Sequence, residues 1–254
     1  MNILLDISYD GSDFHGWQIQ RDLPTVCGVL QNAISCLYGD EPVKLIGVSR
    51  TDASVNALSY IANFHAPNDK FTPKKLKKAL NATIPESIVV NRIAFVDDDF
   101  HARFSALGKI YRYNVVDMDI VFGRRFCHRF FGRLDIEKLN EYAKLFIGEH
   151  DFSAFSIIKS IPPNPVCKIT QSIWQKRMDG AFVYEIEGNR FLHEMVRMIV
   201  GAQLDICRGS LKKEDILRFI QKGERVSEDG ALRNNSAQIK VAPPHALFLQ
   251  KVIY

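Results

Sequence analysis

The sequence has little that would suit a membrane-spanning or a disulfide-stabilised protein. No stretch approaches the roughly 18 uninterrupted apolar residues that a membrane-spanning helix needs. The five cysteines are scattered, and no pair has C-x-x-C spacing, which indicates reduced structural thiols and argues against a cysteine-based zinc site. The N-terminal residues enter a strand pattern without the basic and apolar regions of a signal peptide, so we expect a cytoplasmic protein without a membrane anchor.

The sequence also has little excess of one charge sign. A net charge of +4 over 254 residues is compatible with a polyanionic partner but does not indicate one by itself. The basic residues are clustered, however. The segment KFTPKKLKK is typical of a solvated helix face, whereas GRRFCHRFFGR alternates arginines with phenylalanines and fits an edge strand or a nucleic-acid-binding surface equally well. The candidate contacts to an RNA backbone are Lys74, Lys78, Arg124, Arg125 and Arg129.

The first half of the chain alternates between strand and helix patterns. Thr25 and Thr72 each precede a helical pattern and are predicted N-caps, the second being followed by Pro73. The resulting β-α-β-β-α-β order is that of a ferredoxin-like fold. The expected elements are strands at 3–9, 43–48, 59–66 and 87–96, and helices from 26 to about 39 and at 73–82.

The second half repeats this pattern in outline. Asp179-Gly180 between two strand patterns predicts a hairpin, and the polar segment 223–238 predicts a mobile loop. We therefore expect an α+β protein with a cleft between an N-terminal domain at 1–105 and a C-terminal domain at 106–254. The expected elements of the second half are strands at 109–116, 167–178, 181–189 and 246–254, and helices at 135–148, 190–207 and 213–221.

One connection between two strand patterns, VSRTDASVNA, carries an unusual pair of charges. An aspartate in such a connection is most often a turn former. Arg50 lies two residues before Asp52, however, and on an extended backbone the two side chains would share a face. A guanidinium there would favour the ionised carboxylate, which suits a nucleophile or an electrostatic stabiliser.

Six blocks of sequence, in order along the whole chain, resemble the TruA family of tRNA pseudouridine synthases. They are YDGSDFHGWQIQ, SRTDASVNA, FHARFSALGKIYRY, HDFSAF, GNRFLHEMVRMIVG and APPHALFLQKVIY. The resemblance implies two ferredoxin-like halves packed side by side around a central basic cleft. It also implies isomerisation of uridine to pseudouridine at positions 38, 39 and 40 of the tRNA anticodon stem-loop, by a homodimer without a metal or other cofactor.

The resemblance assigns a role to five residues. Asp52 would be the catalytic nucleophile, and Arg50 would occupy the base stack when the target uridine leaves it. Tyr111 would pack against the flipped base and help to move its proton, Arg197 would pair with Asp52, and Leu247 would wall the uracil pocket. Each of the last three also has an ordinary interpretation: Tyr111 as a half-buried strand residue, Arg197 as the partner of Glu194 in a surface pair, and Leu247 as core.

The chain departs from the family pattern around the aspartate. Ser49 and Ser54 replace glycines and Asn56 replaces a histidine, and a positive φ at Ser54 would cost about 1 kcal/mol. His101 and His193 have no second ligand at usable spacing, so no metal is expected. Two other functions compete with the enzyme: a non-catalytic RNA-binding or RNA-folding protein of the same fold, and an aspartate-dependent glycosidase or nuclease. The sequence shows neither the second catalytic carboxylate that a glycosidase would need nor the metal cluster that a nuclease would need.

Overall fold

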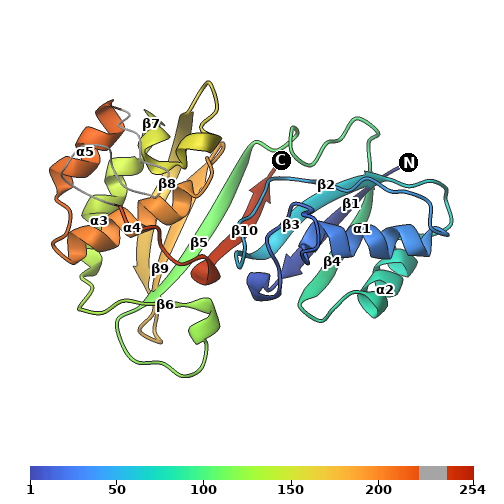
Figure 1. Cartoon of the computed structure of the whole chain (residues 1–254), viewed down its shortest axis with the longest axis horizontal. Coiled ribbons are helices and arrows are strands. Elements are labelled where there is room, and N and C mark those ends of the chain that lie inside the picture. Colours follow the sequence, from blue (N-terminus) through green and yellow to red (C-terminus); the bar gives the residue numbers. More distant parts are fainter. Residues whose placement is uncertain (223–238) are drawn as a thin grey trace. The chain divides into compact units, whose positions relative to one another are not determined.

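A computed structural model describes residues 1–222 and 239–254, so the loop expected at 223–238 lies outside the described residues. The described chain contains both helices and strands, which confirms the α+β class (Figure 1). It divides into two compact units, the first formed by Met1–Leu107 with Phe248–Tyr254 and the second by Gly108–Leu247. Among the described residues, no helix has the length and apolar character needed to cross a membrane.

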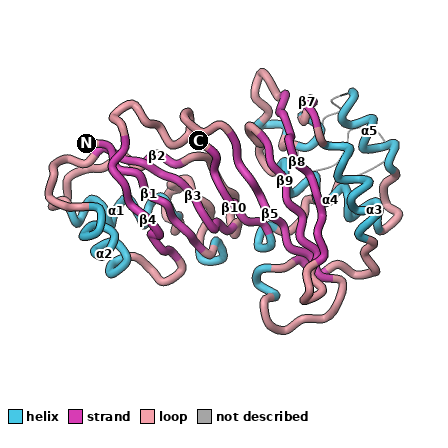
Figure 2. Tube along the Cα trace, turned by 180° about the vertical axis from the view of Figure 1, so that it is seen from behind, coloured by secondary structure: helices cyan, strands magenta, loops and turns pink. Residues whose placement is uncertain are grey.

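The first unit is a sheet with two helices against one face (Figure 1). Its strands lie in the order β4-β1-β3-β10, with β2 paired to β3 (Figure 2). β1 is antiparallel to both neighbours, whereas β10 runs parallel to β3. The elements are β1 (Asn2–Tyr9), α1 (Val26–Leu37), β2 (Ile46–Gly47), β3 (Asn56–His65), α2 (Pro73–Thr83), β4 (Ile88–Val96) and β10 (Leu247–Ile253).

The helix starts of this unit confirm the predicted caps. The Thr25 hydroxyl accepts the Gly28 N–H at 3.3 Å, and the Thr72 hydroxyl accepts the Lys75 N–H at 3.4 Å. The strand predicted at 43–48 is instead reduced to β2. Side chains of α1 take the backbone N–H groups of Val43 and Leu45, so this stretch does not pair in the sheet.

The second unit is an antiparallel sheet whose helices cover one face (Figure 1). Its antiparallel strands lie in the order β5-β9-β8-β7, and the short β6 pairs with β5 in parallel. The predicted hairpin at Asp179-Gly180 joins β8 to β9, with Gly180 at φ 83°. The elements are β5 (Gly108–Val116), β6 (His128–Arg129), α3 (Ile136–Ala143), β7 (Gly148–Asp151), β8 (Val166–Lys176), β9 (Phe182–Gly188), α4 (Met195–Cys207) and α5 (Lys213–Lys222).

Short 3-10 helices join several of these elements. In the described residues they are η1 (Gly11–Asp13), η2 (Arg124–Phe126), η3 (Lys144–Phe146), η4 (Ser153–Phe155), η5 (Ile158–Ser160) and η6 (Pro244–Ala246).

Two long helices predicted for the second half are shorter in the structure. α4 begins at Met195 rather than near residue 190, because Glu194 has a left-handed backbone with φ 60°. α3 ends at Ala143 and continues as η3, and Gly148 at φ 122° then starts β7. Apolar periodicity therefore identified both helices, but it did not give the first residue of α4 or the last residue of α3.

The C-terminal strand differs from the predicted domain division. The sequence assigns residues 246–254 to the second half, whereas Phe248–Tyr254 belongs to the first unit. Phe248 and Leu249 pair with Asn56 and Ala57, and the Tyr254 hydroxyl donates to the Ala102 carbonyl at 2.8 Å. An apolar strand pattern predicts a strand, but it does not identify the neighbour with which the strand pairs.

Residues 239–242 cross α4 in close contact at Gly201. A Cβ atom at Gly201 would overlap the Lys240 carbonyl, so only glycine lets the two backbones approach this closely. Hydrogen bonds fix the crossing segment on both sides. The Lys240 N–H donates to Asp205 Oδ2 at 3.0 Å, and the Ala242 N–H donates to the Arg197 carbonyl at 3.2 Å.

We predict that Gly201→Ala lowers the free energy of unfolding by about 1–3 kcal/mol, because the added methyl group would displace the crossing segment. In an unobstructed helix interior the same change stabilises a protein by about 1 kcal/mol, so the sign of the effect is diagnostic. Denaturant unfolding of both proteins measures it. An unfolding free energy equal to or above that of the wild type would contradict the described packing.

Candidate active site

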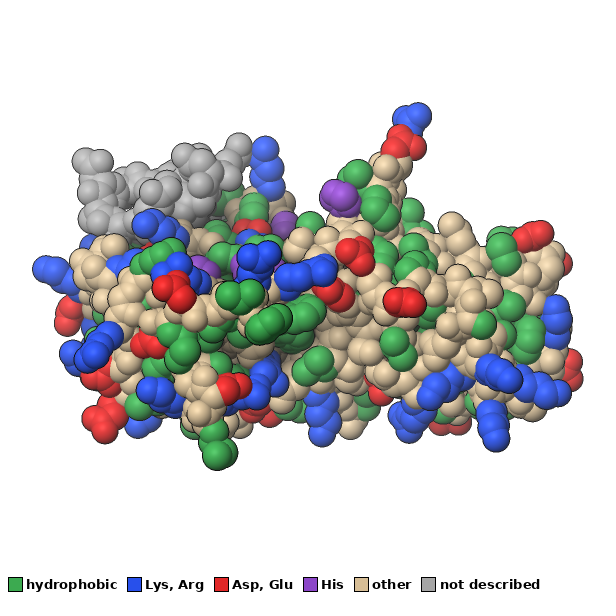
Figure 3. Space-filling view, turned by 90° about the horizontal axis from the view of Figure 1, so that it is seen from below, with side chains coloured by type: hydrophobic (Ala, Val, Ile, Leu, Met, Phe, Trp, Pro, Cys, Tyr) green, Lys and Arg blue, Asp and Glu red, His purple; other side chains and the backbone are tan. Residues whose placement is uncertain are grey.

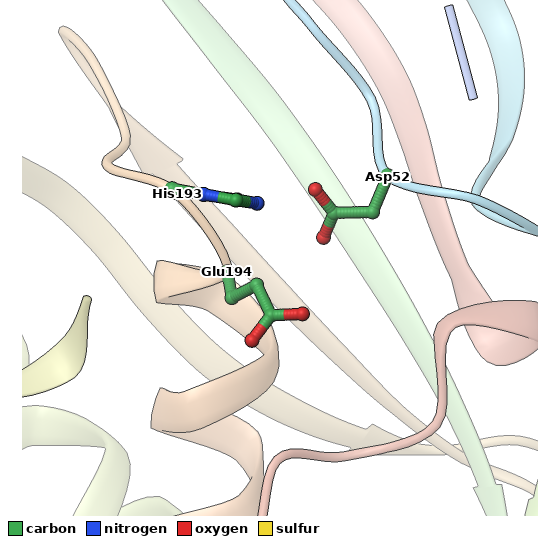
Figure 4. Close-up of side chains that lie close together, drawn as sticks. All are labelled: Asp52, His193 and Glu194. Carbon is green, nitrogen blue, oxygen red and sulfur yellow. The ribbon is translucent and has the colours of Figure 1, made fainter. Parts of the chain in front are cut away.

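Asp52 lies in a turn between β2 and β3. The Val55 N–H donates to the Asp52 carbonyl at 3.2 Å and closes the turn, whose third residue, Ser54, has φ 63°. Asp52 is partly exposed and Ala53 is exposed, so the turn reaches the surface. Figure 4 shows the Asp52 carboxylate at the end of its side chain, beyond the loop ribbon. The positive φ of Ser54 confirms the backbone strain that was expected at this residue.

The segment that follows β1 holds this turn in place. The Tyr9 hydroxyl hydrogen-bonds the Thr51 hydroxyl at 2.9 Å, and the Trp17 N–H donates to the Thr51 carbonyl at 3.2 Å. The Ser54 N–H donates to the Phe14 carbonyl at 3.3 Å. Thr51 is buried, so both of its oxygens are bonded where water cannot replace the partner. The residues on each side of Asp52 are thus fixed by one neighbouring segment.

Two glycines make this close contact possible. A Cβ atom at Gly11 would overlap the Val55 carbonyl, and one at Gly16 would overlap the Thr51 carbonyl. Gly16 also has φ 82°, which favours glycine. The Gly11 N–H donates to Asn56 Oδ1 at 2.8 Å, and Asn56 is buried. Asn56, noted only as a departure from the family pattern, therefore ties the two segments together.

The sequence reasoning missed Tyr9 and Thr51, which fix the backbone beside the candidate nucleophile. Tyr9 is buried at the end of β1. The Tyr9 hydroxyl is the feature that could have indicated this contact, because the hydroxyl of a buried tyrosine usually hydrogen-bonds a polar partner. The partner, Thr51, lies 42 residues further along the chain, and no local sequence pattern identifies a partner at that distance.

Arg50 is exposed and makes no hydrogen bond or ion pair within residues 1–222 and 239–254. The expected role of Arg50 as the counter-ion of Asp52 therefore stays a prediction. Its guanidinium remains available to a ligand.

Tyr111 and Tyr113 lie on β5, in the second unit. Tyr111 is only 7% exposed, and its ring meets the Phe191 ring edge-on at 5.1 Å between centroids. It is thus more buried than the half-buried strand residue considered as the alternative. Tyr113 is fully buried and donates to the Pro243 carbonyl at 2.9 Å, and burial raises its pKa. Tyr113 therefore has a structural partner in the segment that leads to Leu247.

Arg197 and Glu194 form an ion pair at 2.7 Å with side chains only 11% and 17% exposed. The pair of Arg197 with Glu194 that was considered as the alternative is therefore present, but both side chains are mostly buried rather than on an open surface. Arg197 Nε also donates to the Ala242 carbonyl at 2.8 Å. Figure 4 shows Glu194 at the start of α4, next to His193. Because Asp52 belongs to the first unit and Arg197 to the second, the expected pair between them stays a prediction.

Leu247 is 5% exposed at the first position of β10. The residues before it are anchored, since His245 Nε2 hydrogen-bonds the Cys127 carbonyl at 3.2 Å. His101 Nδ1 accepts the N–H groups of Arg103 and Phe104, both at 3.2 Å, and so stabilises a local turn.

The basic side chains differ in exposure and in their contacts. Lys74 and Lys78 are exposed on α2 and have no partner in the described part of the chain. Arg124 and Arg125 are also exposed. Arg129 pairs with Asp119, and its guanidinium lies 4.3 Å from the Phe131 ring centroid. Figure 3 shows lysine and arginine side chains in several groups on one face.

His128, within the arginine-rich segment, does not add to this charge. Burial lowers its pKa to about 4, and the nearby Arg208 and His245 lower it further. Its imidazole is therefore neutral at pH 7.

We predict that Ser54→Gly raises the free energy of unfolding by about 0.5–1 kcal/mol, because glycine adopts the positive φ of this position without strain. Ser49→Gly is the matched control. Ser49 has no positive φ, so the added chain freedom should lower the unfolding free energy by about 0.5–1 kcal/mol. Thermal or denaturant unfolding compares the two variants, and the same sign for both would contradict the assignment of strain to Ser54.

Comparison with known proteins supports the predicted family. A family profile described as tRNA pseudouridine synthase matches residues 7–105 and 142–254. The chain is 38% identical to the tRNA pseudouridine synthase A of Thermoanaerobacter sp. (strain X514), covering 100% of this chain and 99% of that protein. It is 36% identical to the one from Acetivibrio thermocellus, with 100% and 99% coverage, and 32% identical to the one from Bacteroides fragilis, with 98% and 94%.

Among solved structures, the archaeal box H/ACA sRNP Nop10-Cbf5 complex matches with a TM-score of 0.30 and 11% identity, over 89% of this chain and 62% of that chain. This match is too weak to inform the fold. The family profile and the full-length relatives agree with the six sequence blocks. The chain therefore belongs to the tRNA pseudouridine synthase family.

Proposed function

We propose that this member of the family isomerises uridine to pseudouridine at positions 38, 39 and 40 in the anticodon stem-loop of tRNAs. One observation carries the proposal. Asp52, the residue that matches the family's catalytic aspartate, stands on a surface turn that Tyr9, Gly11, Gly16 and Asn56 hold in one position. A surface turn of ordinary function does not require such bracing, whereas a nucleophile must meet its target within a fraction of an ångström.

The reaction explains why a carboxylate is needed. Pseudouridine forms when the bond between C1′ and N1 breaks, the uracil turns, and C5 rejoins the sugar. We assign Asp52 the role of nucleophile, because an uncharged base is a poor leaving group and a carboxylate can form a covalent intermediate. Retaining glycosidases use a carboxylate at an anomeric carbon in this way.

The uridine must leave the base stack before it can react, which costs a few kcal/mol. Arg50 is the residue we propose to fill the vacated position. Its guanidinium is exposed and has no partner within the described residues, and a planar guanidinium stacks on bases. Tyr111, Arg197 and Leu247 are the other proposed substrate-binding residues. Tyr111 lies on β5, Arg197 lies on α4, and Leu247 directly follows η6.

Contacts to the RNA backbone complete the proposal. Lys74, Lys78, Arg124 and Arg125 are exposed and suit phosphate binding. Arg129 would have to give up its ion pair with Asp119 to bind a phosphate. We further propose that the protein acts in the cytoplasm as a homodimer.

We also propose that each half of the chain is ferredoxin-like. In the first unit the order β4-β1-β3, with β2 on the far side of β3, supports this topology.

We predict that Asp52→Asn abolishes pseudouridine formation while tRNA binding changes less than about threefold. The amide keeps the shape of the carboxylate but is not a nucleophile. Single-turnover assays and binding titrations with a tRNA transcript measure the two effects. Asp69→Asn removes the same charge from an exposed aspartate and should leave both unchanged. Substantial turnover by Asp52→Asn would overturn the assignment, and an inactive wild type that binds tRNA would favour the non-catalytic RNA-binding alternative.

We predict that Arg50→Lys loses nearly as much activity as Arg50→Ala. Lysine keeps the positive charge but lacks the planar group that can stack in place of a base. We give charge alone the smaller role, because Arg50 makes no ion pair within the described residues. Single-turnover rates on an anticodon stem-loop decide the question, with Arg92→Lys, an exposed arginine of β4, as the control. A lysine variant close to wild type would refute stacking.

A further inference from the structure

One face of α4 forms a polar stripe under the crossing segment. Arg197, Gly201 and Asp205 follow one another at intervals of four residues and therefore lie on the same face of the helix. Arg197 Nε donates to the Ala242 carbonyl at 2.8 Å. At the other end of the stripe, Asp205 Oδ2 accepts the Lys240 N–H at 3.0 Å. The helix thus holds the segment at two points, and Gly201 between them leaves room for its backbone.

Asp205 is the unexpected member of this stripe, because its side chain is fully buried. A buried carboxylate is costly unless it is paired and hydrogen-bonded. Both oxygens of Asp205 have a partner, since Oδ2 accepts the Lys240 N–H and Oδ1 accepts from the Arg208 guanidinium at 2.8 Å. A position that only filled the interior would carry an apolar residue at lower cost. The carboxylate is therefore explained by what it holds, which is the crossing segment.

The crossing segment leads directly to Leu247. Along this path the Pro243 carbonyl accepts the Tyr113 hydroxyl at 2.9 Å, and His245 Nε2 hydrogen-bonds the Cys127 carbonyl at 3.2 Å. Leu247 follows and is 5% exposed. The position of the Leu247 side chain thus depends on a path of hydrogen-bonded backbone that starts at the stripe on α4.

We propose that Asp205 is a positioning residue for the isomerisation, which acts through the crossing segment to keep Leu247 in place as a wall of the uracil pocket. The inference rests on the proposed function in giving Leu247 that role. Because Asp205 is fully buried, it contacts no substrate itself. Its loss should therefore slow the reaction of bound RNA and leave the affinity for RNA unchanged.

Asp205→Asn tests this role, because the amide keeps the shape of the carboxylate but has one acceptor oxygen instead of two, so that one of the two contacts is lost. The single-turnover rate on a saturating anticodon stem-loop transcript should fall at least about tenfold, as expected for a misplaced pocket residue, while the dissociation constant stays within about twofold.

Asp215→Asn is the matched control. Asp215 Oδ2 also accepts a backbone N–H, that of Lys212 at 2.9 Å, and Asp215 Oδ1 pairs with Arg218 at 3.0 Å. It lies on α5, and these two contacts do not involve the crossing segment. The substitution should change neither the rate nor the affinity.

A double-mutant cycle with Leu247→Ala separates positioning from a general structural effect. If Asp205 acts through Leu247, Asp205→Asn should lower the rate less than about twofold in the Leu247→Ala protein, because the coupled contact is already gone. Equal fold losses in the two backgrounds would overturn the proposal. A wild-type rate in Asp205→Asn alone would also overturn it.

Hydrogen exchange gives a readout that does not depend on activity. The amides of Lys240 and Ala242 should exchange at least about tenfold faster in Asp205→Asn, while those of β8 and β9 keep their rates. An inactive wild type would refute the proposed function, and unchanged exchange at Lys240 would refute the positioning role in either case. Should Asp205→Asn fail to fold, the wild-type protein decides, since rapid exchange of its Lys240 amide would contradict the hydrogen bond to Asp205.

Discussion

The position of the Asp52 carboxylate depends on close backbone contact between two segments of the first unit. The turn that carries Asp52 has one internal hydrogen bond of its own among those described, at 3.2 Å. Its rigidity comes instead from the segment after β1, which approaches so closely that only glycine fits at Gly11 and Gly16. The hydrogen bonds of Thr51 and Asn56 then fix the register between the two segments. This arrangement tolerates a strained Ser54 because the contacts on each side determine the backbone path.

The second unit uses the same device, a strained residue held by its surroundings. Glu194 has a left-handed backbone, and its carboxylate pairs with a largely buried Arg197. Arg197 in turn holds the segment 239–242, which crosses α4 where Gly201 leaves room for it. That segment continues to Leu247, so the proposed wall of the uracil pocket is positioned by α4 rather than by its own strand alone.

The sequence predicted the α+β class, the helix caps and the hairpin, because these depend on local periodicity and on side chains near each helix start. It did not predict the short β2, whose backbone N–H groups are taken by side chains of α1. Nor did it predict the late start of α4. The helix starts late because Glu194 has a left-handed backbone, which residues other than glycine rarely adopt. The family motif predicts Asp52 as the catalytic residue, but the partners of Thr51 depend on contacts between distant segments. Local patterns contain no information about such contacts.

The central claim is that this chain converts uridine to pseudouridine through a braced Asp52. Its most direct test is to map pseudouridine, at single-nucleotide resolution, in an unmodified tRNA transcript after incubation with the purified protein. We predict pseudouridine at one or more of positions 38, 39 and 40, and at no other uridine. A transcript that stays unmodified, or one that is modified only outside the anticodon stem-loop, would contradict the account.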